Sequence, residues 1–387
     1  MSRIIYADVT RLLIRNIRGI RHTGIDRVNL EYARWVHRQG GGLCLRRGTE
    51  LKQLSRDAWG EFLLGEIQPG HPDRRKRQQI SFLLRALAFR RSVPHETTVA
   101  VTTHSWLACQ NTWSWVKSRR KRAFVFIHDL IPIQFPEYSH PREKNLHLRR
   151  LDNTLIHSTG IIVNSQCTES AVRSHAKKVR LAVPPILIAP LGHNLPPTTF
   201  HQPHGRSHPY FVILGTIEPR KNHLLLLTIW RELVKLHGQQ TPHLIVVGRR
   251  GWECEQVVDL LERCEAIHPF LIERKNASDT DVSALLHGAR ALLMPSFAEG
   301  FGMPVQEALA MGTPVISSPL PAIKEFARNI PDYALPHDGV RWLELIEDYT
   351  RPDSPQRQSQ MRRLQAFQRN EWHEHFAKVD QFIKTLE

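Results

Sequence analysis

The stretch Pro295 to Glu307, PSFAEGFGMPVQE, places Glu299 and Glu307 eight positions apart with a glycine-rich turn between them. The apolar run before it, Ala289 to Met294 (ARALLM), predicts a buried strand, and the run Pro304 to Met311 (PVQEALAM) predicts a helix. Free amides at the start of a helix can hold an anion, with support from the helix dipole. One carboxylate before the turn and one inside the helix can hold hydroxyl groups on either side of a phosphate. The pattern therefore favours a pocket for a nucleotide sugar over two surface glutamates beside a turn.

This segment also carries a resemblance to a known family. It resembles the E-x7-E signature of retaining glycosyltransferases with the GT-B fold, glycosyltransferase family 4 in particular. The continuation GTPVISSPLPAIKEFA, Gly312 to Ala327, is similar to the next strand and loop of that family. The resemblance implies that Glu299 holds the donor sugar and that Glu307 holds the ribose of the nucleotide. The donor-binding residues implied in this turn are Glu299, Gly300, Phe301, Gly302, Met303 and Glu307.

A second segment, Tyr210 to His223, reads YFVILGTIEPRKNH and predicts a strand that ends in a basic turn. The helix expected next has an apolar face formed by Leu224, Leu227, Trp230, Leu233 and Val234. A leaving diphosphate needs cations such as Arg220 and Lys221, because negative charge grows on it. The turn looks like the diphosphate-binding turn of the same family, which implies donor contacts from Gly215, Thr216, Arg220 and Lys221. Many relatives have an arginine where this chain has Thr216, so which cation meets which phosphate stays open.

Length and composition bound the class of protein. A chain of 387 residues with 41% hydrophobic content suggests two domains, each with its own core. Lysine and arginine outnumber aspartate and glutamate by 16, so a polyanion is expected as partner: anionic lipid, nucleic acid or a phosphorylated substrate. No run of eighteen apolar residues exists, and the start MSRIIYADVT has no signal-peptide layout. Five scattered cysteines without metal-site spacing favour a reducing cytoplasm.

The chain is expected to divide at Leu195 to Pro209, where prolines, histidines and polar residues follow no period. Strand and helix patterns alternate after it, and TTVAVTT, AFVFIHD and GIIVNS are strand candidates before it. We therefore expect an α/β protein with two Rossmann-like domains facing a cleft, the GT-B fold. The expected parts are residues 1–195, an acceptor-binding domain; 196–209, a linker; 210–365, a nucleotide-sugar domain; and 366–387, a helix crossing back.

The first domain has one clear candidate site at the end of a strand. The stretch Ala123 to Tyr138, AFVFIHDLIPIQFPEY, puts His128 and Asp129 where open α/β sheets place functional groups. Relatives carry a histidine near the reacting sugar here, which implies that His128 contacts the donor hexose or stabilises the transition state. A histidine bonded only to its neighbours is the alternative. Asp129 is a candidate for acceptor binding.

The turn Arg21 to Arg34, RHTGIDRVNLEYAR, is the other feature of this domain. It resembles the TGIDRV element of a subset of bacterial polysaccharide glycosyltransferases. Gly24 is expected to open the loop over the donor pocket, and Arg27 to touch phosphate or acceptor. Asp26 has two interpretations of equal weight, a functional role and a helix cap.

Three further segments are open to more than one interpretation. Asp279 and Asp281 resemble a D-x-D metal motif, but a helix cap is favoured, and no metal site is expected. Two basic segments, Asp73 to Arg91 and His104 to Arg122, mix cations with apolar residues, which suits a membrane interface or single-stranded nucleic acid. A solvated basic face is an alternative of similar weight. On the membrane interpretation, two tryptophans insert by apolar burial, Trp113 and Trp115.

Together these patterns predict a retaining, metal-independent glycosyltransferase without a cofactor. The catalytic candidates are His128, Arg220, Lys221 and Glu299. The expected donor is GDP-mannose or a UDP-sugar, and the expected acceptor is a lipid-linked or growing bacterial polysaccharide, such as an exopolysaccharide. The expected place is the cytoplasm, peripherally on the inner face of the cell membrane, with no nucleic acid as partner. Two alternatives remain: a hydrolase or epimerase of nucleotide sugars with the same fold, and a nucleic-acid-binding protein without catalysis.

Overall fold

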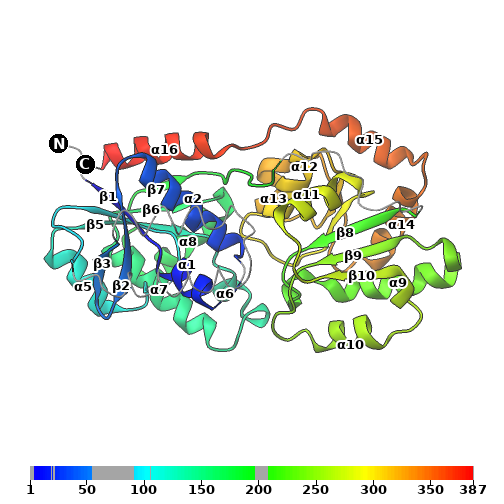
Figure 1. Ribbon diagram of the computed structural model, residues 1–387, viewed down its shortest axis with the longest axis horizontal. Helices are drawn as coiled ribbons and strands as arrows, with labels where there is room; N and C mark the ends of the chain where they lie inside the picture. Colours follow the sequence, from blue (N-terminus) through cyan, green and yellow to red (C-terminus); the bar gives the residue numbers. More distant parts are fainter. Residues whose placement is uncertain are drawn as a thin grey trace, which may run out of the picture. The chain divides into compact units, whose positions relative to one another are not determined.

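The computed structural model describes residues 4–18, 20, 22–54, 91–104, 106–196 and 208–386, and it divides into two compact units. Unit 1 consists of Met1–Ile133, Arg142–Pro190 and Trp372–Glu387, and unit 2 consists of Gln134–Pro141 and Leu191–Glu371. Each unit contains one β-sheet with helices packed on it (Figure 1). The first boundary thus lies before the expected linker at 196–209, of which residues 197–207 fall outside the described part.

Buried side chains explain where the boundaries fall. Gln306 is buried, and its Nε2–H donates to the Leu191 carbonyl at 2.9 Å. Asn370 Nδ2–H donates to Gln306 Oε1 at 3.4 Å, and the His193 amide donates to the Asn370 carbonyl at 3.3 Å. These bonds draw residues 191–195 and 366–371 into unit 2, although the sequence pattern assigned them to the first domain and to the crossing helix.

Unit 1 is built on a seven-stranded sheet in the order β3-β2-β1-β4-β5-β6-β7, parallel except for the β2–β3 pair. Its strands are β1 (Ile5–Asp8), β2 (Gly42–Arg47), β3 (Glu50–Gln53), β4 (Thr98–Val101), β5 (Arg122–Ile127), β6 (Gly160–Val163) and β7 (Ile186–Ile188). Its helices are α1 (Thr10–Ile17), α2 (Gly24–Arg38), α5 (Gln110–Ser118), α7 (Glu143–His157), α8 (Gln166–Val179) and α16 (Trp372–Thr385), with α6 (Ile131–Gln134) at its boundary. Every residue of β4 and β6 is buried, as expected for parallel strands that are covered on both faces.

Unit 2 is built on a parallel sheet in the order β10-β9-β8-β11-β12-β13. Its strands are β8 (Tyr210–Leu214), β9 (His243–Val247), β10 (Leu271–Arg274), β11 (Leu292–Met294), β12 (Val315–Ser317) and β13 (Asp332–Tyr333). Its helices are α9 (His223–His237), α10 (Glu255–Arg263), α11 (Asp279–Gly288), α12 (Met303–Ala310), α13 (Pro321–Ala327), α14 (Gly339–Thr350) and α15 (Pro355–Leu364). Because β8 and β11 are parallel neighbours, the two turns singled out in the sequence leave the same edge of the sheet.

Alternate residues of the strands feed two cores on opposite faces of this sheet. Phe211 and Ile213 belong to the core formed with α9, α10 and α14, whereas Tyr210 and Val212 belong to the core formed with α11, α12 and α13. Figure 1 shows α9 and α10 below the sheet and α11 to α13 above it. The apolar face of α9 is wider than its period indicates: the buried residues are Leu226, Leu227, Ile229, Trp230 and Leu233, and Leu224 is only half-buried.

The tryptophans of the basic segment His104–Arg122 lie in the core of unit 1. Trp106, Trp113 and Trp115 are 1%, 0% and 9% exposed. The expectation that Trp113 and Trp115 insert into a membrane is therefore wrong, because these rings already fill the space around α5. Lys121 is buried as well, with its Nζ 4.4 Å from the centroid of the Trp115 ring.

Fewer cations of this segment reach the surface than the sequence indicates. Lys117 and Arg120 are exposed, whereas Arg119 Nη1 shares a 3.1 Å hydrogen bond with His95 Nε2. The other basic segment, Asp73–Arg91, lies outside the described residues except for its last residue. Among the helices of the described ranges, none is long and apolar enough to cross a membrane.

Two helices end the chain, α15 and α16, and the expected crossing segment 366–387 contains α16. α16 packs on α2 of unit 1 through aromatic side chains. Phe376 stacks on Trp35 with ring centroids 5.1 Å apart and planes 4° apart. The Tyr32 hydroxyl and His375 Nε2 share a hydrogen bond of 2.9 Å. These contacts place the C-terminal helix in the first unit.

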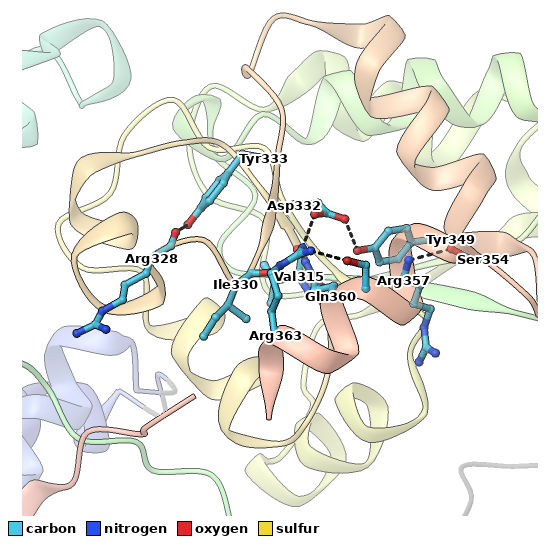
Figure 2. Close-up of polar contacts among 11 residues, drawn as sticks. Val315, Arg328, Ile330, Asp332, Tyr333, Tyr349, Ser354, Arg357, Gln360 and Arg363 are labelled. Atoms are coloured by element: carbon cyan, nitrogen blue, oxygen red, sulfur yellow. Dashed lines mark hydrogen bonds and ion pairs between the residues drawn. The ribbon is translucent and has the colours of Figure 1, made fainter. Parts of the chain in front are cut away.

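A polar network fastens α15 to the sheet of unit 2 (Figure 2). The Tyr349 hydroxyl donates to Asp332 Oδ2 at 2.7 Å, and Arg363 Nη2–H donates to Asp332 Oδ1 at 2.5 Å. The Gln360 side chain accepts from the backbone N–H of Val315 and donates to its carbonyl, each at 2.7 Å. Gln360 therefore supplies a hydrogen bond to each of two buried backbone groups of one sheet residue.

We expect the Gln360→Leu variant to lower the free energy of unfolding by roughly 2 kcal/mol, because both buried Val315 groups then lose their hydrogen bonds to this side chain. The matched control is Gln358→Leu on the exposed face of the same helix. It should change stability by less than about 0.5 kcal/mol. Urea denaturation of the two variants and the parent measures this difference, and equal effects would contradict the role given to Gln360.

Candidate active site

The turn between β8 and α9 is a compact loop that depends on glycine. Gly215 has φ +148°, and a Cβ on it would lie 3.1 Å from Lys221 Cε. Gly248, after β9, has φ +154°, and a Cβ on it would lie 1.8 Å from the Gly215 carbonyl oxygen. Thr216 packs against the loop after β9 as well. A Cβ on Gly251, in that loop, would lie only 2.7 Å from Thr216 Cγ2. This close backbone approach fixes the place of Lys221.

Four charged side chains meet where β8 and β11 end. The 3-10 turn η2 (Pro219–Lys221) presents two cations. Arg220 pairs with Glu218 Oε1 at 2.6 Å and with Glu299 Oε2 at 2.8 Å. Lys221 Nζ pairs with Glu299 Oε1 at 2.8 Å. We call Glu218, Arg220, Lys221 and Glu299 the charge cluster.

Burial and ion pairing shift the pKa values of the charge cluster in opposite directions. Burial by itself raises the pKa of Glu299, but the Arg220 guanidinium and the Lys221 ammonium outweigh it and hold that pKa at about 2. Burial lowers the pKa of Lys221, and Glu299 opposes this shift. Two cations and two carboxylates balance, so each buried charge has a partner of opposite sign.

The charge cluster also remains within reach of solvent. The Arg220 side chain is 18% exposed, and those of Lys221 and Glu299 are each 8% exposed. An anion can therefore meet both cations without unfolding the turn. A carboxylate freed by such an exchange can accept hydrogen bonds from hydroxyl groups. The arrangement suits a ligand that joins an anionic group to a polyhydroxylated one.

The second turn of the site leads from β11 into α12. It contains the stretch from Gly300 to Met303, where donor contacts are expected. Gly302 has φ +96°, and a Cβ on it would lie 2.8 Å from Ile323 Cγ1. The Phe301 ring is buried and stacks on Phe326 with centroids 5.0 Å apart. Glu307 lies inside α12 and is 2% exposed.

Three residues of this region were not predicted from the sequence. Glu218 completes the charge cluster. In the sequence, only its position two residues before Arg220 indicated a role in this turn. Asn222 has φ +57°, and its Nδ2–H donates to the carbonyls of Pro295 and Pro336 at 3.2 and 2.8 Å. His223 is 3% exposed, and both of its ring nitrogens lack a hydrogen-bond partner. No spacing distinguished Asn222 or His223 from their neighbours.

In unit 1, His128 follows β5 directly, but its ring is bonded locally. Its Nε2–H donates to the Thr102 carbonyl at 2.8 Å, and the Asn164 side chain donates to the His128 carbonyl at 2.9 Å. Burial lowers the pKa of His128, although the bond to Thr102 opposes this shift. In the neutral ring the other nitrogen, Nδ1, is an acceptor. His128 can therefore accept a hydrogen bond from a sugar hydroxyl.

Two more histidines, His104 and His147, lie close to His128. Neither was predicted from the sequence, because the chain contains many histidines and no spacing distinguishes these two. The ring centroid of His104 is 5.9 Å from that of His128 and 5.0 Å from that of His147, edge to face. His147 Nε2–H donates to the Asp129 carbonyl at 3.1 Å. Asp129 Oδ1 accepts from the Ile131 amide at 3.0 Å, so this carboxylate fixes the start of α6.

The TGIDRV element begins a helix rather than a loop. Gly24 is the first residue of α2, so it does not open a loop, and its contact with the donor stays a prediction. Asp26 Oδ2 accepts from the amide and the hydroxyl of Thr23, both at 2.7 Å, and caps this helix. The buried Asp26 carboxylate also pairs with two arginines of α1, at 2.7 and 2.9 Å. Arg27 is half-buried in the first turn of α2.

The D-x-D sequence of Asp279 and Asp281 is part of a helix cap, as the favoured interpretation had it. The Asp281 amide donates to Ser278 Oγ at 3.1 Å, and Asp281 Oδ2 accepts from the Ser278 amide at 2.8 Å. Over the ranges that the structure describes, no three histidine, cysteine, aspartate or glutamate side chains gather as a metal-binding group.

The part of the chain that contains both turns is similar to a known protein family. Residues 198–330 match the family described as glycosyl transferases group 1. Serotype-specific mannosyltransferase WbdA of Escherichia coli is 33% identical over 153 residues, which are 38% of this chain and 18% of that protein. O-antigen chain mannosyltransferase B of Escherichia coli is 32% identical over 143 residues, 36% of this chain and 37% of that protein. The chain thus spans less than two fifths of these relatives, and both turns lie in the matched segment, which confirms the resemblance.

Solved structures of similar fold extend over the whole chain. The Anabaena protein Alr3699/HepE in complex with UDP-glucose has a TM-score of 0.65 at 14% identity, with 99% of each chain covered. Sucrose-phosphate synthase from Thermosynechococcus elongatus has a TM-score of 0.64 at 14% identity and covers 100% of this chain and 99% of its own. These likenesses confirm the expected α/β GT-B fold class.

His223 makes the stability of the chain depend on pH. Burial lowers its pKa to about 3 in the folded chain, against about 6.5 in an unfolded one. Below pH 6.5 the unfolded chain binds a proton that the folded chain does not, so stability falls as the pH falls. Between pH 7.5 and pH 5 this contribution amounts to about 2 kcal/mol.

The His223→Leu variant removes this contribution and should lose less stability over the same pH range. At pH 7.5 it should be at least as stable as the parent, because leucine removes two buried nitrogens that lack partners. Urea unfolding of both proteins at pH 7.5 and pH 5 measures the effect. The assignment fails if the parent loses no more stability than the variant.

Proposed function

We propose that this chain is a retaining, metal-independent glycosyltransferase that moves a hexose from a nucleotide sugar to a saccharide acceptor. The observation that supports this most is the charge cluster, in which Glu299 meets Arg220 and Lys221 at 2.8 Å. It lies where two parallel strands end, which is where open α/β sheets bind ligands. It also lies within the segment that matches group 1 glycosyl transferases.

The charge cluster exchanges partners when the donor binds. Without donor, Glu299 pairs with both cations, and Glu218 supplies the second negative charge. A diphosphate carries more negative charge than one carboxylate, so Arg220 and Lys221 turn to it with charge-assisted hydrogen bonds. Glu299 is then free to accept hydrogen bonds from the hexose hydroxyls. As the glycosidic bond breaks, charge grows on the diphosphate, and cations that are already in place stabilise it. The two side-chain cations thereby stabilise the charge on the diphosphate, which a metal ion does in metal-dependent enzymes.

The substrates follow from the relatives and from the expected site residues. Two relatives are named mannosyltransferases, one of them for an O-antigen chain, which favours mannose from GDP-mannose over a UDP-sugar. Glu307 holds the ribose, and the Nδ1 of His128 accepts from a hexose hydroxyl. The acceptor is a lipid-linked or growing polysaccharide. Arg27 is the candidate for a contact with it.

We also place the enzyme at the inner face of the cell membrane, held there by charge. The chain carries a net charge of +16, and anionic lipid attracts basic surfaces within a Debye length, about 8 Å at physiological salt. Lys117 and Arg120 are exposed cations that can contribute. Because the neighbouring tryptophans are buried, the attraction is electrostatic and weakens as salt rises.

A panel of nucleotide sugars tests the proposed donor. GDP-mannose should raise the melting temperature, because a ligand at one hundred times its Kd adds about 2.7 kcal/mol of stability. EDTA should change neither this shift nor the transfer of labelled hexose to a membrane extract. The absence of a shift with every nucleotide sugar, or a strict need for a divalent metal, would overturn the proposal. Donor turnover without any acceptor would indicate a hydrolase or an epimerase.

Glu299→Gln tests the charge cluster directly. The amide keeps the volume but loses the charge that pairs with both cations, so kcat should fall about 30-fold or more, equivalent to roughly 2 kcal/mol. The matched control is Glu255→Gln, an exposed position on α10, which should keep the kcat of the parent. Steady-state kinetics of both variants decide the matter. If both variants had the same kcat, the proposed role of Glu299 in the site would be contradicted.

A further inference from the structure

The segment Gln134–Pro141 lies between two stretches of unit 1 in the chain, yet it packs as part of unit 2. Its 3-10 turn η1 (Pro136–Tyr138) places the ring of Tyr138 on that of Phe297, with centroids 5.3 Å apart and planes 13° apart. Phe135, on the same segment, tilts against Tyr138 at a centroid distance of 6.3 Å and is 38% exposed. Stacking of this kind attracts and restrains both rings.

Phe297 stands two residues before Glu299, and its backbone holds the basic turn. The Phe297 N–H donates to the Arg220 carbonyl at 2.9 Å. The carbonyl of the next residue, Ala298, accepts from Arg220 Nη1 at 2.7 Å. Arg220 is therefore bound at its backbone and at its guanidinium by backbone groups of two consecutive residues. These bonds join the β11–α12 turn to η2.

The geometry of the charge cluster depends on this join. Glu299 meets Arg220 and Lys221 at 2.8 Å only while the two turns keep their separation. Small displacements of such groups are costly, because catalysis by fixed charges needs them in place before the reaction. A contact that restrains Phe297 therefore restrains the alignment of the charge cluster.

We propose that Tyr138 is a positioning residue for the reaction. Its ring holds Phe297, the backbone of Phe297 and Ala298 holds Arg220, and Arg220 thereby stays aligned with Glu299 for the departing diphosphate. This inference rests on the proposed glycosyltransferase function. It assigns a role to a segment that follows His128 in the chain but packs with the donor-binding unit.

Tyr138→Ala should lower kcat about ten-fold while the KM for the donor changes less than about two-fold, because alignment in the transition state is lost and not donor binding. Tyr138→Phe keeps the ring and should keep the kcat of the parent. Phe135→Ala is the matched control, since it removes a ring from the same segment but not from the stack. The inference is overturned if Tyr138→Ala has the kcat of Phe135→Ala, or if only the KM for the acceptor rises.

Hydrogen exchange provides a readout that needs no activity. Tyr138→Ala should speed exchange in a peptide that covers residues 295–299, because the Phe297 amide is bonded to the Arg220 carbonyl. Phe297→Leu probes the same stack from the other side and replaces Tyr138→Ala should that variant unfold. Unchanged exchange would overturn the inference. If the parent transfers no sugar, the proposed function fails, and the exchange result still decides whether Tyr138 restrains this turn.

Discussion

Pairing of buried charges is the constraint on which the rest of the structure depends. Taking a carboxylate or an ammonium group out of water costs several kcal/mol per ion unless an opposite charge meets it. Glu299 can meet Arg220 and Lys221 because β8 and β11 are parallel neighbours, so the turns that follow them leave the same sheet edge. Because Gly215 and Gly248 have no Cβ, the backbones of the loops after β8 and β9 can pack directly against each other. The ion pairs therefore depend on the order of the strands in the sheet and on the geometry of the turns that follow them.

The same pairing prepares the site for its ligand. Arg220 and Lys221 are balanced by Glu218 and Glu299, and in the proposed function a diphosphate sugar enters this neutral arrangement by exchange of partners. The cations need not move far, because η2 and Asn222 fix the turn on both sides. In the proposed function, the cost of burying charge is met before the donor arrives, which is the preorganisation that fixed charges require for catalysis.

Sequence patterns predicted the features that depend on near neighbours in the chain. Short apolar runs became β4, β5, β6 and β8, and the turn after β11 begins α12 close to its proline. Features decided by distant contacts were missed. Trp113 and Trp115 beside lysines look alike in a core and at a membrane, and only packing shows that they are buried. The unit boundary depends on the Gln306 bond to Leu191. The pairing of Glu218 with Arg220 is local, but it was missed as well, because it depends on a turn geometry that spacing does not reveal.

A crystal structure with GDP-mannose bound would show whether the charge cluster holds the donor. We expect diphosphate oxygens within hydrogen-bond distance of the Arg220 guanidinium and the Lys221 ammonium. We also expect that Glu299 has exchanged at least one cation for a hydroxyl of the hexose. A diphosphate bound elsewhere, with Glu299 still paired to both cations, would contradict this role of the charge cluster.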